Sequence, residues 1–206
     1  GTYLDKKGIL KTATSGVPRF HTIYSSGECG LLIEGSRTNL FLRSQEFDAA
    51  SWTKTAMTVT ADSVVAPDGA TTADTLVATG GGFANQGVTV SSGATVAISI
   101  FAKRSNVNWL RIRVSATNTR SVWFNLATGA IGAAPSTSAD LTAFSSSIES
   151  LPNGWYRCVV VVTTSGITTL NVAFSGAAAD GSAAVNTDEV YAWGAQLESG
   201  AFPSSY

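Results

Sequence analysis

Apolar and polar residues alternate with a period of two in the segments 96–103, 108–114, 122–126 and 170–175. A strand that is buried on one side shows this pattern, because successive side chains point to opposite faces. One set of alternating positions is uniformly apolar and forms the predicted core: Val96, Ile98, Ile100, Ala102, Leu110, Ile112, Val114, Val122, Phe124, Leu126, Leu170, Val172 and Phe174. The pattern therefore predicts half-buried strands.

Turn-forming residues separate further strand-like segments along the chain. Strands are predicted at 57–65, 73–78, 83–90, 94–103, 108–116, 120–127, 130–133, 144–150, 155–164, 168–175 and 189–197. Breaks that contain glycine, such as Pro67-Asp68-Gly69 and Pro152-Asn153-Gly154, lie between them and favour tight turns. Many short strands with few helices predict an all-β fold, an antiparallel β-sandwich of the jelly-roll type.

One helical turn is predicted, over residues 42–52. Ser44 can cap it, and Phe47 and Trp52 would anchor it to the core. Beyond this segment no window keeps a 3.6-residue apolar period without interruption by Gly, Ser or Thr.

Residues 1–40 differ from the body of the chain, residues 41–206, which is the predicted jelly-roll binding domain. The segment 3–10 predicts a small hairpin with Gly8 in its turn, and residues 30–34 predict a short strand. This extended segment has too little apolar mass to fold alone, so we expect it to dock on the body or on a neighbouring subunit. The polar opening of the chain is typical of a fragment cut from a longer polypeptide.

Charged residues make up 13% of the 206 residues, about half of what is usual for a soluble domain. The net charge is −1 and the chain has only five lysines, so we do not expect it to bind nucleic acid. No apolar stretch approaches the ~20 residues that a membrane-spanning helix needs, so no membrane insertion is expected. Ser, Thr and Gly account for 70 residues and suit strands joined by turns. The composition indicates an extracellular or virion-bound β-protein.

Two cysteines and two tryptophans fall in contexts that predict packing. Cys29 and Cys158 are far apart in sequence, and we predict free thiols in packed positions, with a disulfide between them as the alternative. Trp155 begins an apolar strand directly after a turn, and Trp193 lies in a second apolar strand, so both are predicted core anchors.

The other set of alternating positions combines aromatic rings, cationic groups and amides. If the strands are neighbours, one sheet face carries Phe101, Lys103, Trp109, Arg111, Arg113, Trp123, Asn125 and Asn171. Flat aromatic rings stack on the apolar face of a sugar ring, while guanidinium and amide groups bind hydroxyls or a carboxylate. The face therefore predicts binding of a polysaccharide or cell-surface glycan, and its cationic groups favour an acidic one.

A structural role for the same face is the alternative. Trp109 and Trp123 would then lie beneath residues 1–40 or in a subunit contact. Arg111 and Arg113 would pair with the carboxylates of Glu34, Glu46 or Asp48.

Several motifs together resemble phage structural and tail-fibre-type proteins, whose related regions are jelly-roll carbohydrate-binding modules. The motifs are Gly30–Leu40, Ser44–Asp48, Trp52–Lys54, Ala66–Gly69, Phe124–Gly129, Asn153–Arg157 and Trp193–Gly200. The resemblance implies a non-catalytic, virion-associated or enzyme-appended module that binds polysaccharide. The alternative is a structural domain of a virion fibre or tail protein, which forms a homo-oligomer, a trimer in a fibre, through residues 1–40.

No cofactor is required by these inferences, but modules of this kind often hold a structural calcium. By their oxygen chemistry the candidate ligands are Glu46, Asp48, Asp188 and Glu198. Catalysis is not expected: His21 is the one histidine, no Gly-x-Ser-x-Gly elbow is present, and the carboxylates are scattered in turns. Ser25-Ser26-Gly27, near His21, is predicted to be a turn.

Overall fold

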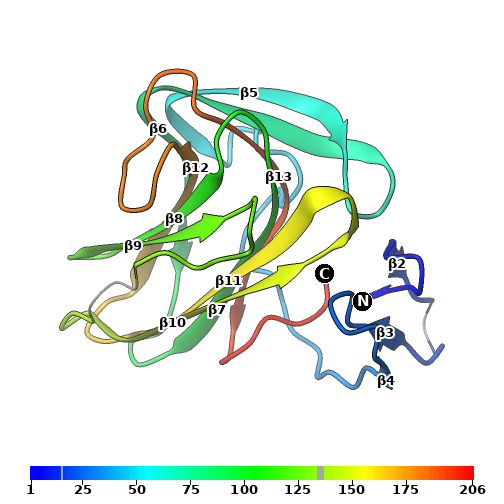
Figure 1. Cartoon of the computed structure of the whole chain (residues 1–206). Helices are drawn as coiled ribbons and strands as arrows, with labels where there is room; N and C mark the ends of the chain where they lie inside the picture. Colours follow the sequence, from blue (N-terminus) through cyan, green and yellow to red (C-terminus); the bar gives the residue numbers. More distant parts are fainter. Residues whose placement is uncertain (15, 134–136) are drawn as a thin grey trace.

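The computed structural model describes residues 1–14, 16–133 and 137–206, and it is built of β-strands (Figure 1). The strands are β1 Thr2–Leu4, β2 Leu10–Thr12, β3 Phe20–Thr22, β4 Cys29–Leu31, β5 Thr53–Val65, β6 Thr71–Thr89, β7 Thr95–Arg104, β8 Trp109–Ser115, β9 Thr119–Asn125, β10 Leu141–Ser150, β11 Trp155–Thr164, β12 Thr169–Ala177 and β13 Glu189–Ser199. Within the described residues there is one turn of 3-10 helix, η1 (Pro152–Gly154), and no α-helix.

The strands follow the predicted segments closely, with two differences. β6 unites the segments 73–78 and 83–90 in one long strand. The strand predicted at 130–133 is wrong, because that segment makes only one isolated bridge, between Ile131 and Phe124.

The strands form two antiparallel layers. β10, β11, β7, β13 and the first half of β6 are neighbours in the first layer. The second half of β6, then β12, β8 and β9, form the second layer. β5 follows β6 through both layers. The predicted antiparallel β-sandwich of the jelly-roll type is confirmed.

The long strand β6 passes from one layer to the other at a glycine corner. Gly80 and Gly81 have φ angles of 132° and 56°, in the left-handed region that favours glycine. Gly82 follows them, and a Cβ there would overlap the carbonyl group of Ala56 on β5. Three consecutive glycines thus allow both strands to bend together.

The core lies between the layers and consists of the predicted apolar set. Ile98 and Ile100 of the first layer and Leu110 and Ile112 of the second are completely buried in one cluster. Burial of each such side chain contributes roughly 1.5–3 kcal/mol, so the alternation accounts for most of the driving force for folding.

Residues 42–52 are a series of turns, and the predicted helical turn is wrong. The amides of Glu46 and Trp52 donate to carbonyl groups three residues earlier, and Arg43 has a φ angle of 54°. Ser44 does not act as a cap, because its hydroxyl group bonds to another side chain. Phe47 is a buried anchor as predicted.

The N-terminal segment packs on the outer side of the first layer. β1 and β2 pair as the predicted hairpin, and their Leu4 and Leu10 form a second apolar cluster with Phe101, Trp155 and Trp193. Both tryptophans are therefore packed as predicted. Figure 1 shows the blue N-terminal strands gathered at one end of the molecule, beside the red C-terminal tail.

Both cysteines are free thiols, as predicted, but only one of them is packed. Cys29 is exposed on β4, whereas Cys158 is buried in the core. Burial raises the pKa of the Cys158 thiol well above its usual value.

Candidate functional site

The outer side of the second layer carries the main group of predicted binding residues. Trp109, Arg111 and Arg113 point outward from β8, and Trp123 and Asn125 point outward from β9, while the residues between them are buried. We call the surface formed by these five residues the Trp/Arg face.

The strand register places these side chains opposite one another. Trp109 lies opposite Asn125, and Arg111 lies opposite Trp123. The Arg111 guanidinium carbon is 5.3 Å from the Trp123 ring centroid, and its Nε donates to Ser121 Oγ at 3.0 Å. The guanidinium group of Arg111 is therefore held by two side chains of β9.

Small residues on the neighbouring strand β12 make room for the second guanidinium group. Ala173 and Ser175 lie opposite Arg113 and Arg111 and are only 2% and 3% exposed, although they point outward. The Arg113 guanidinium carbon lies 3.9 Å from the ring centroid of Phe83 on β6. Phe83 was not predicted, but its alternation with Ala84 in the second half of β6 is a signal that would have found it.

Neither arginine of the Trp/Arg face has an acidic partner in the part of the chain that the structure describes. Arg113 Nε is buried there without a hydrogen-bond partner. Burial lowers the pKa of both arginines, and the neighbouring charge of Arg113 lowers that of Arg111 further. Two adjacent, partly desolvated cations without a counter-charge favour an anion at this surface.

The predicted alternative pairing of these arginines with acids of the N-terminal region is wrong. Glu34 pairs with Arg19 at 2.9 Å, and Glu46 pairs with Arg43 at 3.2 Å. Asp48 is not within ion-pair distance of either arginine of the face. The alternative that residues 1–40 cover Trp109 and Trp123 is wrong as well, because the hairpin of that segment packs on the other layer.

One end of the Trp/Arg face is bounded by a loop. Trp123 Nε1 donates to the carbonyl oxygen of Ser182 at 2.7 Å, so the connection between β12 and β13 holds this ring in place. Asp180 of the same connection accepts from the amide of Ala133. The indole of Trp123 is thus fixed in orientation before any ligand binds.

Three predicted members of the face lie apart from its centre. Phe101 is 2% exposed and Lys103 follows it on β7, which belongs to the first layer. Their predicted place beside Trp109 is wrong, because the chain crosses between layers from β7 to β8. Asn171 is exposed on β12, and its register partner on β8 is Ser115. It belongs to the same layer as Trp109, at the far end of the strand.

The four candidate calcium ligands are not brought together. Asp188 directly precedes β13 and Glu198 lies near the end of that strand, about 33 Å away for ten extended residues. Glu46 pairs with Arg43, and Asp48 lies on an exposed turn. No group of three or more His, Cys, Asp or Glu side chains within residues 1–14, 16–133 and 137–206 could hold a metal ion. The predicted ligand set is therefore wrong.

His21 takes no part in a nucleophilic group. Its Nδ1 accepts from the Leu4 amide at 3.2 Å, and its Nε2 lies 3.9 Å from Glu149. Residues 25–27 form the predicted turn, in which the Ser26 hydroxyl bonds to Glu28.

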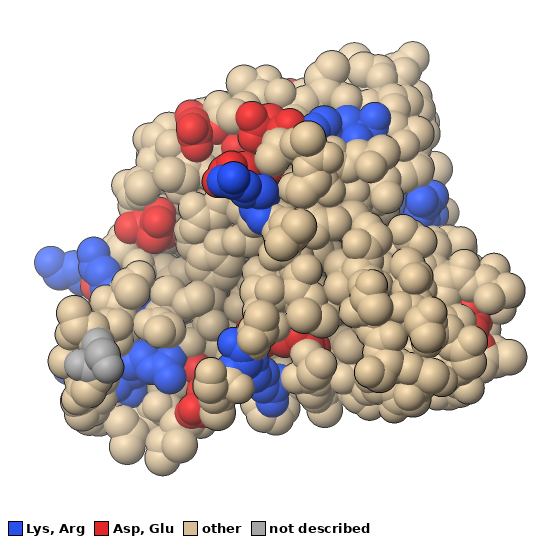
Figure 2. All heavy atoms as spheres, turned by 180° about the vertical axis from the view of Figure 1, so that it is seen from behind, with Lys and Arg blue, Asp and Glu red and all other residues tan. Residues whose placement is uncertain are grey.

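Charge is sparse over the rest of the surface. On the side seen in Figure 2, basic and acidic groups occur in small clusters separated by wide uncharged areas. None of the described helices is long and apolar enough to cross a membrane.

The fold and this surface define a jelly-roll β-sandwich with an aromatic and cationic outer face. No protein-family model and no curated protein sequence matches the chain. Among solved structures it is similar to the enzymatically active domain of tailspike protein 4 of bacteriophage CBA120, at 13% identity and a TM-score of 0.47. The match covers 78% of this chain and 21% of that chain, so this chain spans about a fifth of the length of that tailspike domain.

Two structures that contain carbohydrate-binding modules are also similar to the chain. TmCBM61, solved with β-1,4-galactotriose, is 12% identical with a TM-score of 0.45, and the match covers 78% of this chain and 98% of that one. The CBM22-1-GH10 modules of Clostridium thermocellum xylanase 10B, solved with xylohexaose, are 8% identical with a TM-score of 0.43, covering 80% and 28%. A phage tailspike domain and carbohydrate-binding modules, the two classes named by the sequence resemblance, thus both occur among its structural neighbours. The likeness is one of fold and transfers no ligand.

Proposed function

We propose that the protein binds acidic polysaccharide through the Trp/Arg face, as a non-catalytic module of an extracellular or virion-associated protein. The observation that carries the proposal is the pair Arg111 and Arg113, adjacent on β8, partly buried, and without a carboxylate partner in the described residues. A bound carboxylate would supply the missing counter-charge.

The surroundings of the two arginines suit a sugar chain. Trp109 and Trp123 lie beside Arg111 on the same surface and offer flat apolar area to the C–H faces of sugar rings. Each guanidinium group presents a planar fork of donors that matches a carboxylate. A net hydrogen bond to a charged group contributes roughly 1.5–3 kcal/mol, so two such contacts would dominate the affinity.

The side chains of the Trp/Arg face are also held in place before a ligand binds. Arg111 is fixed by Ser121 and by the Trp123 ring, Arg113 by the Phe83 ring, and Trp123 by the carbonyl group of Ser182. Side chains that are already ordered lose little entropy when a ligand binds, which favours affinity.

The test begins with an array of acidic and neutral polysaccharides, followed by titration calorimetry with polygalacturonate and its methyl-esterified, neutral form. We expect binding of the acidic form, and at least about tenfold weaker binding when Arg111→Gln and Arg113→Gln are combined, a loss of about 1.4 kcal/mol. Lys103→Gln is the matched control, because it removes one positive charge from the other layer and should leave binding unchanged.

The aromatic half of the proposal is tested separately. Trp109→Ala and Trp123→Ala should each weaken binding of the acidic and the neutral form alike, since stacking does not depend on charge. Binding that survives both aromatic and both arginine substitutions would refute the assignment of this face.

A second candidate function is assembly through residues 1–40, and it rests on a different observation. The hairpin of β3 and β4 exposes Phe20 by 56% and Leu31 by 54%, and Ile33 just beyond it is 85% exposed. Grouped exposed apolar side chains of this kind often mark an interface with another chain. A homo-oligomer, a trimer in a fibre, would bury them.

Light scattering tests the assembly. Deleting residues 1–40 would uncover the apolar cluster around Trp155, so the cleaner change is Phe20→Ser combined with Leu31→Ser. We expect an oligomer for the intact chain and a monomer for this variant. A monomeric intact chain would remove the assembly function without affecting the proposal for glycan binding.

A further inference from the structure

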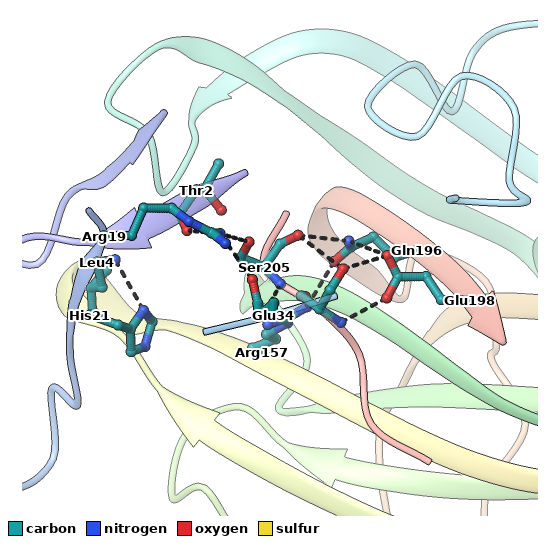
Figure 3. Close-up of polar contacts among 10 residues, drawn as sticks. Thr2, Leu4, Arg19, His21, Glu34, Arg157, Gln196, Glu198 and Ser205 are labelled. Carbon is teal, nitrogen blue, oxygen red and sulfur yellow. Dashed lines mark hydrogen bonds and ion pairs between the residues drawn. The ribbon is translucent and has the colours of Figure 1, made fainter. Parts of the chain in front are cut away.

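A polar cavity lies on the opposite side of the sandwich from the Trp/Arg face. It has a volume of about 550 Å³ and lies between residues 34–39, the C-terminal tail 204–206 and the outward side of β13. Figure 3 shows how side chains from these three parts converge, with Glu34, Ser205, Gln196 and Glu198 linked by hydrogen bonds. We call this space the junction cleft.

The carboxylates of the junction cleft are occupied by the protein itself. Glu198 accepts from the amide and the hydroxyl group of Ser204, both at 2.7 Å. Glu34 accepts from the amide of Ser205 at 2.7 Å and pairs with Arg19 at 2.9 Å. Burial raises the pKa of Glu34, but the hydrogen bonds from Ser205 and Arg19 lower it by more, so Glu34 is ionised at neutral pH. These contacts fix the walls of the cleft.

Two arginines of the junction cleft have N–H donors without a hydrogen-bond partner. Each guanidinium group has five N–H donors. Arg19 uses only Nη1, which contacts Thr2, Glu34 and Ser205. Arg37 uses only Nη1, which donates to the carbonyl oxygen of Phe202. Within the described residues the Nε and Nη2 atoms of both arginines have no hydrogen-bond partner. The groups that remain available to a ligand in the cleft are therefore mainly donors.

One guanidinium group of the junction cleft has no acidic partner. Arg37 lies 4.2 Å above the Phe202 ring and has no acidic partner among the described residues. Arg157 beneath the cleft donates to Gln196 and to the carbonyl oxygen of Ser204. Burial lowers the pKa of Arg157, and the negative charges of Glu149, Glu198 and Glu34 oppose that shift. The lining carries two guanidinium groups, of Arg19 and Arg37, and two carboxylates, of Glu34 and Glu198. Glu34 pairs with Arg19, and Glu198 accepts from Ser204, so the guanidinium group of Arg37 remains to pair with a ligand that has one negative charge.

We infer that the junction cleft binds a single acidic sugar residue, such as the end of a glycan chain that carries a carboxylate. The unused donors of Arg19 and Arg37 would hold the carboxylate, and the hydroxyl group of Ser36 on the lining would bind a ring hydroxyl. The volume lies within the roughly 300–1,000 Å³ typical of small-molecule pockets. A concave site of this size takes a chain end, whereas the flat Trp/Arg face suits the length of a chain.

The experiment is an NMR titration of the ¹⁵N-labelled full chain with methyl β-D-glucuronide, up to a concentration of about 10 mM, at which a ligand with a Kd of about 1 mM nearly saturates its site. Methyl β-D-glucoside and sodium sulfate are titrated in parallel. We expect the glucuronide to shift the backbone amides of residues 34–39 and 204–206, and the two comparison compounds to bind at least about tenfold more weakly.

Three variants locate the site. Arg37→Gln should weaken glucuronide binding about tenfold, because it removes a surface guanidinium group without disturbing the tail contacts of Glu34 and Glu198. Arg104→Gln, an exposed arginine on β7, is the matched control and should have no effect. The combined change Arg111→Gln and Arg113→Gln should have no effect either, which separates this site from the proposed function. Amide spectra of each variant establish that the fold is retained.

The outcomes are distinct. No shifts with glucuronide, or shifts that Arg37→Gln leaves unchanged, would overturn the inference. Loss of glucuronide binding in the Arg111 and Arg113 variant would assign the ligand to the Trp/Arg face. Equal binding of sulfate would show that the cleft accepts any small anion and would refute the sugar ligand.

Discussion

Asp74 on β6 makes the stability of the fold depend on pH in a direction opposite to that of most carboxylates. The side chain is 1% exposed and accepts from the amides of Phe47 at 2.7 Å and Asp62 at 3.0 Å. Burial raises the pKa of Asp74 from its ordinary value of 3.8 to about 6, although these hydrogen bonds oppose the shift, and the charges of Asp48 and Asp62 add to it.

The sign follows from proton binding. Between pH 4 and pH 6 the folded state keeps the proton on Asp74 while the unfolded state releases it, so stability falls as the pH rises. A shift of about 2 pKa units corresponds to at most about 3 kcal/mol, of which roughly 1–2 kcal/mol is lost between pH 4.5 and pH 7.5. The stabilisation is complete below about pH 4 and is lost above about pH 6.

Urea unfolding at pH 4.5 and pH 7.5 measures this contribution. For the wild-type protein, the contribution of Asp74 to the free energy of unfolding should fall by roughly 1–2 kcal/mol from pH 4.5 to pH 7.5. Asp74→Asn removes the titrating group, so this part of the decrease should be absent in the variant. Asp68→Asn, in a surface turn, is the matched control and should leave the pH dependence as it is. An unchanged pH dependence in Asp74→Asn would refute the reasoning.

Three further predictions concern packing. Trp155→Ala should lower the free energy of unfolding by about 3–5 kcal/mol, because it empties the cluster beneath the N-terminal hairpin, and urea denaturation measures the loss. Gly82→Ala should cost at least about 1–3 kcal/mol through overlap with a backbone carbonyl group of β5, whereas Gly30→Ala, with open space around it, should be nearly neutral by the same assay. A thiol reagent should modify Cys29 within minutes and Cys158 only at the rate of unfolding, and equal rates for both would contradict the burial of Cys158.

The sequence predicted the inside and outside of individual strands well, because alternation is a local property. Ile112 between Arg111 and Arg113 is buried as expected, and β11 has the predicted bounds. Alternation does not tell which layer a strand joins. Phe101 was therefore placed beside Trp109, although β7 and β8 lie in different layers.

Other features depend on contacts between distant parts of the chain. Phe47 and Trp52 were predicted as anchors of a helical turn, but residues 42–52 form a series of turns instead. Arg43 adopts a left-handed conformation there, and nothing in the sequence predicts it. The junction cleft was not predicted at all. Glu34 and Ser205 are 171 residues apart, and only the complete fold brings them together.

The passage of β6 through both layers has a consequence for the order of folding during synthesis. Its first half pairs with β13, where Val77 lies opposite Glu189, about 110 residues later in the chain. Its second half pairs with β12, where Gly87 lies opposite Asn171. Contacts of such long range form slowly, because the intervening chain must first lose much of its conformational freedom. β5 precedes β6 and can pair with it at once, but the ribosome must make most of the remaining chain before the other edge of β6 finds its partners. Until then that edge is unpaired, and a chaperone would recognise it.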